Sequence, residues 1–398
     1  MKANDIEALA PSVAIPAPEE LIARAEALIP YLREQADRHR QERRLLPEAI
    51  AKVREAGLFR VLQPRRWGGY EMSPAVFGEV QNRLARGDTS MGFAYGVMMV
   101  HSFHVGFYDD RVAREVWGED PDALIASPYI PAGRAVKVEG GYRLSGRWPF
   151  STGCDNCDWN FLSGTIEGEE GPLLTRMHAF LVPRADAAIV DSWHVMGLQG
   201  TGSKDIEVKD AFVPDYRVER FPITDPAACP GYAHNDGPLF HVPFLPLFFR
   251  AVSSAALGAL EAMIEQFCAY TAGRYTVLSE QVARDPAVQI ALAQARAGAE
   301  EMHATLLRDL ESMYEAAQAR TPLAPDRFTM LMLQSTNVPH RCEQLALGLM
   351  RAAGANGIRL DRALAPLFSD ILVIGQHSSN NPKMPASNLG KMMLNVMD

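Results

Sequence analysis

The order in which hydrophobic periodicity changes along the 398 residues is the feature that most restricts the fold. Apolar residues recur at helical spacing up to about residue 114, alternate with polar residues from about 121 to 222, and return to helical spacing beyond 247. Helices, then strands, then long helices exclude a doubly wound sheet, in which the two alternate. We therefore predict an α+β fold: an N-terminal α-helical domain over 1–121, a central β domain over 122–236 and a C-terminal four-helix bundle over 237–398.

Individual segments support this division. Leu21, Ala25, Leu28, Leu32 and Ala36 form one apolar stripe, which predicts a first helix that packs on one side. The residues from 222 to 245 are rich in Pro, Gly and Asp, and predict a connecting loop or lid. The helices of the bundle are predicted at 247–276, 286–319, 326–353 and 359–376.

Composition and charge argue against several kinds of partner. The net charge is -9, and acidic and basic residues are interspersed, so no basic stripe predicts nucleic-acid binding. The N-terminus lacks the residue order of a signal peptide, and we expect a cytoplasmic protein. The least charged stretch, 90–108, contains two histidines and several small residues, which predicts a buried core helix rather than a membrane partner.

Three short motifs suggest sites that their surroundings do not support. Cys154 and Cys157 form a lone CxxC with no second pair, so we interpret them as two thiols in or beside a strand. His101 and His104 lie one helical turn apart without a third ligand, and we predict no metal site. The stretch GLQGTG at 197–202 lacks the Lys-Ser/Thr ending of a P-loop and the helix that should follow it. Any nucleotide must be bound in another way.

Longer stretches carry a resemblance that covers nearly the whole chain. LPEAIAKVREAGLFRVLQPRRWGGYEMSP, GYRLSGRWPFSTGCDNCDW, MGLQGTGSKDIEVKDAFVP and GANGIRLDRALAPLFSD occur in this order. In order and spacing they resemble the acyl-CoA dehydrogenase superfamily. That resemblance implies an α domain, a β domain and a four-helix bundle, usually in a homotetramer, with flavin between the β domain and the bundle.

The position of the dehydrogenases' catalytic glutamate distinguishes the branches of this superfamily. His377 and Ser378 stand where one group of dehydrogenases has it, and no carboxylate lies in 245–254, where another group has it. A thioester dehydrogenase cannot work without this base. WPFSTG and GLQGTGSKD are instead similar to the flavin hydroxylases, the group of the p-hydroxyphenylacetate and hydroxylated-steroid oxygenases.

The resemblance to this branch implies a two-component monooxygenase. A separate NAD(P)H-dependent flavin reductase supplies reduced flavin, FADH2 or FMNH2, and O2 adds at the C4a carbon. The resulting hydroperoxide hydroxylates a small aromatic substrate with a phenolic or indole-like ring. The flavin supplies the difficult step, and the protein excludes water and activates the substrate.

The resemblance also implies roles for single residues. Ser151 matches the hydroxyl that meets flavin N5, and a neutral donor and acceptor suits that contact. His101 and His377 match the two histidines of the hydroxylase pocket, where a base that titrates near neutral pH can accept a phenol proton. Ser127 matches a hydroxyl that contacts the substrate phenol.

Further positions match contacts to the flavin itself. They are Trp148, Phe150 and Thr152 beside Ser151, Thr201 and Ser203 in GTGS, Arg274 for the flavin phosphate, and Gly354 and Gly357 for a backbone contact. The arginine that the branch commonly carries before Asp370 is missing from 366–369. FAD and FMN therefore both stay open.

Three alternatives remain open. The first is an acyl-CoA dehydrogenase or oxidase with a relocated base. The second is an N- or S-oxygenase of the same branch, which would use the same chemistry on a heteroatom. The third is a non-catalytic member that keeps the fold as a binding module.

Overall fold

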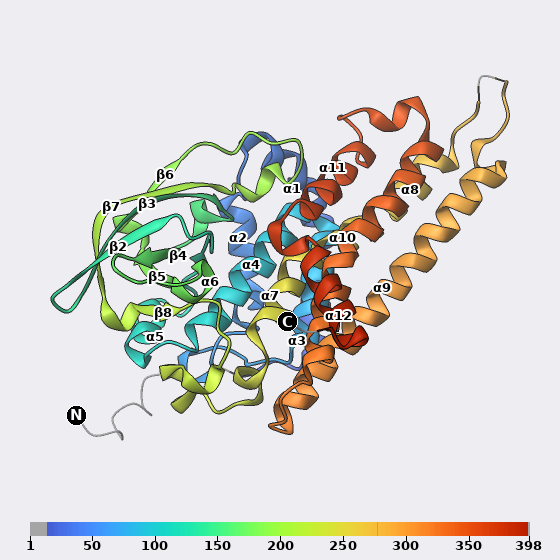
Figure 1. The fold of residues 1–398 in the computed structure, drawn as a ribbon. Coiled ribbons are helices and arrows are strands. Elements are labelled where there is room, and N and C mark those ends of the chain that lie inside the picture. The colour runs from blue at the N-terminus through green and yellow to red at the C-terminus, as the bar shows by residue number, and fades with distance from the viewer. Residues whose placement is uncertain (1–13, 277, 397–398) are drawn as a thin grey trace.

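The computed structural model describes residues 14–276 and 278–396, without the side chain of Pro226. A helical segment, a β-sheet and a second helical segment follow one another in the predicted order (Figure 1). The α+β fold class is therefore confirmed. The last N-terminal helix ends at Trp117 and the first strand begins at Ile125, whereas the proposed domain limits remain predictions. The first 13 residues, including part of the N-terminal stretch interpreted above, lie outside the described residues.

The N-terminal segment surrounds one fully buried helix. Its helices are α1 (Pro18–Glu42), α2 (Pro47–Glu55), α3 (Pro74–Gly87), α4 (Thr89–Val105) and α5 (Asp110–Trp117), with short 3-10 turns η2 (Leu58–Arg60) and η3 (Arg65–Trp67). Asp88 caps α4 by accepting the amide hydrogen of Ser90 at 3.0 Å. Every residue of α4 is buried, which confirms the predicted core helix. Gly92 and Gly96 let α4 approach α3 and α7 closely.

The central sheet has the strand order β6-β7-β3-β2-β4-β5-β8, and β1 pairs with β4. The strands are β1 (Ile125–Ala126), β2 (Gly133–Val138), β3 (Gly141–Ser151), β4 (Trp159–Ile166), β5 (Met177–Pro183), β6 (Ala188–Val190), β7 (Lys204–Pro214) and β8 (Val218–Arg220). Short helices between them are η4 (Cys154–Asn156), α6 (Leu173–Arg176), η5 (Arg184–Asp186), η6 (Gln199–Thr201) and η7 (Asp215–Arg217). The β3–β7 pairing is irregular between Trp148 and Ser151, just before β3 ends. Such an irregularity changes the direction of the side chains that follow it.

The connection from the sheet to the bundle is packed rather than free. It contains η8 (Pro226–Ala228), η9 (Pro230–Ala233) and η10 (Pro238–His241). The side-chain amide of Asn235 donates to the carbonyl of Gly106 at 2.8 Å, and the ring of Phe240 stacks near that of Phe103. The predicted connection is therefore present, and it lies against the first helical segment.

The C-terminal segment differs in detail from the prediction. Its helices are α7 (Phe244–Ser253), α8 (Ala255–Ala272), α9 (Pro286–Gln318), α10 (Pro325–Ala353), α11 (Leu364–Gly375) and α12 (Lys383–Leu394), with η11 (Val282–Arg284), η12 (Ala355–Ile358) and η13 (Ser378–Asn380). The single helix predicted over 247–276 is two helices that meet at Ser254. Helix α11 starts at Leu364 rather than 359, and the turn before it is closed by the amide of Arg362, which donates to the carbonyl of Arg359 at 3.2 Å. The short helix α12 was not predicted.

One stretch has the length and apolar character of a membrane span. It is 244–272, which comprises α7 and α8, and 94% of its most apolar window is buried inside the protein. Such burial is typical of the core helix of a bundle.

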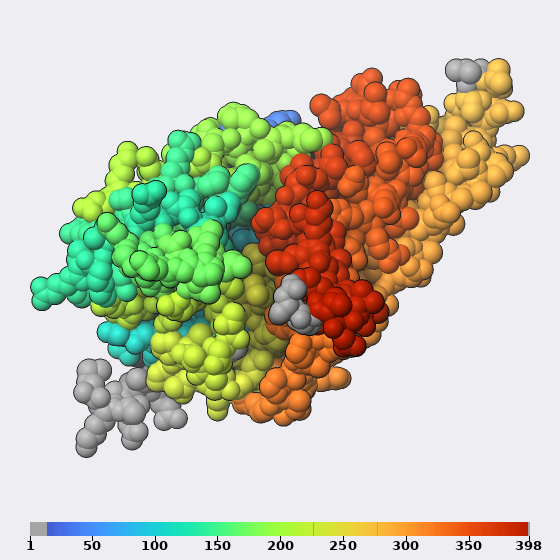
Figure 2. Space-filling model, in the orientation of Figure 1, coloured from blue at the N-terminus to red at the C-terminus, as the bar shows by residue number. Residues whose placement is uncertain are grey.

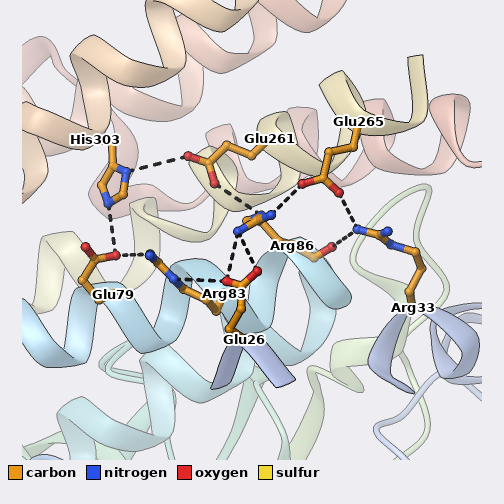
Figure 3. A network of polar contacts seen from close by, with 8 residues as sticks. All are labelled: Glu26, Arg33, Glu79, Arg83, Arg86, Glu261, Glu265 and His303. Atoms are coloured by element: carbon orange, nitrogen blue, oxygen red, sulfur yellow. Dashed lines mark hydrogen bonds and ion pairs between the residues drawn. The ribbon is translucent and has the colours of Figure 1, made fainter. Parts of the chain in front are cut away.

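An ion-pair network ties the first helical segment to the bundle (Figure 3). It joins α1, α3, α8 and α9 through Glu26, Arg33, Glu79, Arg83, Arg86, Glu261, Glu265 and His303. Arg86 lies at its centre and pairs with Glu265 at 2.7 Å. Because several charges share partners, the network holds the two helical segments together better than isolated surface pairs would.

Candidate active site

A hollow lies between the sheet and the C-terminal helices (Figure 2). Helix α4, which carries His101, contacts both the turn after β3, where a Cβ on Gly153 would lie 2.2 Å from Met98, and the segment that carries His377. The ring of His377 lies 6.3 Å from that of Phe93 in α4 and 6.3 Å from that of Phe248 in α7. Phe93 and His377, nearly 300 positions apart in sequence, therefore lie side by side.

Ser151 ends β3 with an unsatisfied hydroxyl. The residue is fully buried, and within the described part of the chain its Oγ has no hydrogen-bond partner. Leaving a buried hydroxyl unpaired costs about 1–3 kcal/mol, so native structures rarely keep one without a reason. A bound group that offers a hydrogen-bonding atom here would remove that cost.

The turn after Ser151 is tied to the GTGS loop by a chain of hydroxyl groups. Thr152 Oγ1 lies 2.9 Å from Ser203 Oγ, which lies 2.7 Å from Thr201 Oγ1. The amide of Gly153 donates to the carbonyl of Thr201 at 3.0 Å. The structure thus brings together the two motifs that the sequence predicted to share a ligand.

Two backbone positions beside this turn are strained. Phe150 has a φ of 68° and Leu198 a φ of 54°, in the left-handed region that side chains with a Cβ disfavour. Each costs on the order of 1–2 kcal/mol, and such residues concentrate at binding sites. Because they precede Ser151 and the GTGS motif respectively, they support a ligand-binding role for these two segments.

His101 is held in one tautomer by its neighbours. Its Nδ1 lies 2.8 Å from the carbonyl oxygen of Ile125, which can only accept, so Nδ1 carries the hydrogen. Burial lowers the pKa of His101 to about 4, so the ring is neutral at neutral pH. Its Nε2 is then a lone-pair acceptor, and it receives the hydrogen of Ser127 Oγ at 2.7 Å. His101 and Ser127, predicted separately, form one unit.

His377 has the opposite tautomer. Its Nδ1 accepts the amide hydrogen of Ser379 at 3.2 Å, so in the neutral ring the hydrogen sits on Nε2. Burial lowers the pKa of His377 to about 4 as well. At neutral pH Nε2 of His377 is therefore a hydrogen-bond donor, whereas Nε2 of His101 is an acceptor.

Two aromatic side chains beside His101, Tyr129 and Phe221, were not predicted from the sequence. The ring of Tyr129 lies edge-on to His101 at 5.4 Å and stacks on Phe221 at 4.1 Å. Its hydroxyl bonds Nδ1 of His104 at 2.6 Å, which accounts for the second histidine of α4. Tyr129 follows Ser127 by two positions, and this closeness in sequence to a predicted substrate contact could have indicated it.

Trp148 and Phe150, both predicted to line the flavin, lie in different surroundings. Trp148 is fully buried under Gly133, and its indole donates to the carbonyl of Ser163 at 2.6 Å, so its ring belongs to the sheet core. Phe150 is 57% exposed and meets the ring of Trp193 edge-on at 6.1 Å. Of these two side chains, only Phe150 has a ring that is free to pack against a flavin.

Arg274 and the Gly354 turn come together, away from Ser151. Nη1 of Arg274 donates to the carbonyl of Ala353 at 2.7 Å, and Gly354 follows with a φ of 66°. Gly357 lies in the adjoining turn η12. Figure 1 shows the end of α8 and the start of α9, which flank Arg274, projecting away from the sheet. These predicted flavin contacts form a separate cluster from the one around Ser151.

The two thiols of the CxxC motif are buried, which disfavours their thiolate forms. Burial raises the pKa of Cys154 to about 12 and that of Cys157 well above its usual value. The described residues contain no group of three or more His, Cys, Asp or Glu side chains that could hold a metal ion.

The residues around Ser151 fit a flavin ring. The unpartnered hydroxyl of Ser151 can hydrogen-bond a ring nitrogen, and the Thr152–Ser203–Thr201 hydroxyls offer further polar atoms beside it. His377 faces the aromatic side chains of α4 and α7. A mostly apolar site with a few fixed polar groups is typical of cofactor pockets.

Comparison with known proteins identifies the family. Residues 251–382 match the family model described as acyl-CoA dehydrogenase, C-terminal domain. A pigment production hydroxylase from Rhodococcus erythropolis is 35% identical over 338 residues, which cover 84% of this chain and 86% of that protein. A flavin-dependent monooxygenase, oxygenase subunit HsaA, from Rhodococcus jostii is 34% identical over 276 residues, which cover 68% of this chain and 71% of that protein. The chain belongs to the flavin-dependent monooxygenases of the acyl-CoA dehydrogenase fold. The predicted enzyme class and flavin cofactor are thereby confirmed.

Other members of the family agree along almost the whole length of this monooxygenase. An FADH2-dependent resorcinol hydroxylase, oxygenase component, from Rhizobium sp. is 29% identical and covers 94% of both chains. The crystal structure of the HsaA monooxygenase from Mycobacterium tuberculosis superposes with a TM-score of 0.90 at 27% identity, covering 96% of this chain and 98% of that one. The dehydrogenase alternative thus loses its support.

Proposed function

We propose that this monooxygenase is the oxygenase component of a two-component system that hydroxylates a small phenolic or indole-like ring. The observation that carries the proposal is the His101–Ser127 unit, whose acceptor nitrogen is fixed by the carbonyl of Ile125. A neutral acceptor behind a hydroxyl is suited to an aromatic O–H or N–H. Bound reduced flavin, with O2, supplies the electrophilic oxygen.

Ser127 and His101 move the substrate proton. The phenol hydrogen bonds Ser127 Oγ while the serine hydrogen bonds Nε2 of His101, so one shift along both bonds takes the proton to the imidazole. A free phenol has a pKa of about 10, far above that of His101, so complete ionisation before reaction is unfavourable. The proton moves as oxygen attack withdraws electrons from the ring and makes the O–H acidic.

His377 and Ser151 act on the flavin side of the pocket. His377 presents the hydrogen on Nε2, and it can donate to an oxygen that gains negative charge during transfer. Ser151 can bond flavin N5 without imposing a charge, which helps keep the proton there. Tyr129 and Phe248 narrow the pocket and exclude water from it.

The proposal includes a reductase partner, a cellular location and a subunit arrangement. The relatives' names call them oxygenase components, which supports a separate flavin reductase. We propose that this reductase draws on NAD(P)H and that both proteins work in the cytoplasm. Arg274, Gly354 and Gly357 would hold the flavin tail of a neighbouring subunit in a homotetramer. Leu278 and Ile358 near that cluster are 78% and 69% exposed, as residues awaiting a partner would be.

The test supplies reduced FAD or FMN from a generic flavin reductase, labelled O2, and a panel of phenols, indoles, amines and sulfides. A hydroxylated ring that carries one labelled oxygen is expected with a phenol or an indole. Labelled oxygen on nitrogen or sulfur instead would replace this proposal with the heteroatom alternative. A double substitution of His101 and Ser127 to Ala should abolish ring hydroxylation while leaving flavin binding intact.

A further inference from the structure

One hydrogen bond joins helix α11 to the loop that carries the GTGS motif. Oδ1 of Asp370 accepts the amide hydrogen of Leu198 at 2.6 Å. The adjoining Gly197 lies so close to α11 that an added Cβ would come within 2.3 Å of the carbonyl oxygen of Ser369. The loop therefore docks on the helix with no clearance.

The same helix and loop lead to both sides of the candidate active site. The loop continues into Thr201 and Ser203, which reach the turn after Ser151. Helix α11, which carries Asp370, ends at Gly375, two positions before His377. The Asp370–Leu198 contact thus bridges the sheet side and the bundle side of the pocket.

A cavity of about 150 Å³ adjoins this contact, and Asp370 helps to line it. The groups that face the carboxylate are Asp88 and Thr89 at the start of α4 and Arg40 of α1. Asp88 is in turn bonded to Nδ1 of His39 at 2.6 Å. Water in the cavity could exchange protons with Asp370, which does not touch the proposed substrate residues.

We propose that Asp370 is a positioning residue for the flavin site: by accepting the Leu198 amide hydrogen it holds loop 197–203 on α11 and so fixes Ser151 relative to His377. The flavin as ligand rests on the proposed function, whereas the docking of the loop does not. A charged carboxylate accepts a hydrogen bond about twice as strongly as a neutral group, so the ionised form holds the loop more firmly.

The ionisation of Asp370 falls in an accessible pH range. Burial, with the Leu198 amide opposing it and Asp88 adding to it, raises the pKa of Asp370 to about 7. Arg40 and Thr89 oppose the shift. If flavin binds only when the loop is docked, bound flavin favours the ionised carboxylate of Asp370. Flavin affinity should therefore rise as pH increases through this range.

The experiment compares Asp370→Asn with Asp361→Asn, a surface aspartate paired with Arg359 just before α11. Oxidised FMN and FAD are titrated into each protein between about pH 5.5 and about pH 8.5, with flavin fluorescence as the readout. The wild type and D361N should gain about five- to tenfold in affinity across the range. D370N should stay flat at the weak, low-pH value, and a D370N profile equal to that of the wild type would overturn the proposal.

Hydrogen exchange without flavin provides a second readout. At one pH above neutral, the peptide that covers 197–203 should exchange faster in D370N than in D361N. Equal exchange would contradict the docking role. If D370N does not fold, Asp370→Ser leaves a neutral acceptor for the same two measurements. A protein that binds flavin with this pH dependence but forms no hydroxylated product would leave the positioning role intact and refute the proposed function.

Discussion

Substitution of Ser127 by alanine separates the proposed proton path from simple packing. Ser127 is 6% exposed, and its hydroxyl is the partner of Nε2 of the fully buried His101 at 2.7 Å. Removing it leaves that nitrogen unpaired, which should cost about 1–3 kcal/mol of unfolding free energy. If the pair transfers the substrate proton, the hydroxylation rate should also fall by about 10²- to 10⁴-fold.

Ser102→Ala, at a buried serine next to His101 on helix α4, provides the matched control. Ser102 is 2% exposed, and its Oγ donates only to the carbonyl of Met98 at 3.4 Å. Its loss should change stability by less than about 1 kcal/mol and leave hydroxylation near the wild-type rate. Urea unfolding gives the stability, and single-turnover product formation with excess substrate gives the rate. Equal hydroxylation by the Ser127 and Ser102 variants would refute the relay.

Three other perturbations follow from the same geometry. Because the pKa of His101 is about 4, hydroxylation by folded enzyme with saturating flavin should be flat above about pH 5 and fall as His101 becomes protonated below that; a fall near pH 7 instead, in both the wild type and D370N, would exclude this assignment. His377→Gln, which keeps a donor, should retain about tenfold more activity than His377→Ala if His377 donates, and equal losses would favour a base. A hydrogen bond to Glu79 raises the pKa of His303 in the folded protein. This pair therefore stabilises the fold at pH values below the pKa of His303 in the unfolded chain, and its effect is lost as pH rises through the pKa of His303 in the folded protein. His303→Gln should therefore lose about 1 kcal/mol near pH 6 and less near pH 9 by urea unfolding, and a loss that does not change with pH would contradict this.

The order of helices and strands could be predicted because it depends on local periodicity. The break between α7 and α8 could not, because Ser254 keeps helical backbone angles and the two helices share one apolar pattern. The start of α11 at Leu364 could not either, because residues 359–362 form a backbone turn that the apolar pattern does not reveal. Local patterns thus predicted which elements exist better than where they end.

The candidate site divides in the same way. Motifs predicted Ser151, His101 and His377, and the structure brings their elements together, while their chemical roles remain predictions. The tautomers of the histidines depend on Ile125 and Ser379, whose backbone groups are positioned by the fold. Trp148 was misplaced because a tryptophan beside a motif serves a sheet core as readily as a ligand, and only burial distinguishes the two.

The most direct test of the account follows reduced flavin in a stopped-flow instrument. Wild type and Ser151→Ala are mixed anaerobically with reduced FAD or FMN and then with oxygenated buffer, and the near-ultraviolet absorbance is recorded. We predict a long-lived oxygenated flavin species in the wild type that decays at least about tenfold faster in the variant, since Ser151 offers the unpartnered hydroxyl at the site. Return to oxidised flavin at the rate of free flavin in the wild type, or equal lifetimes in the two proteins, would contradict the role given to this pocket.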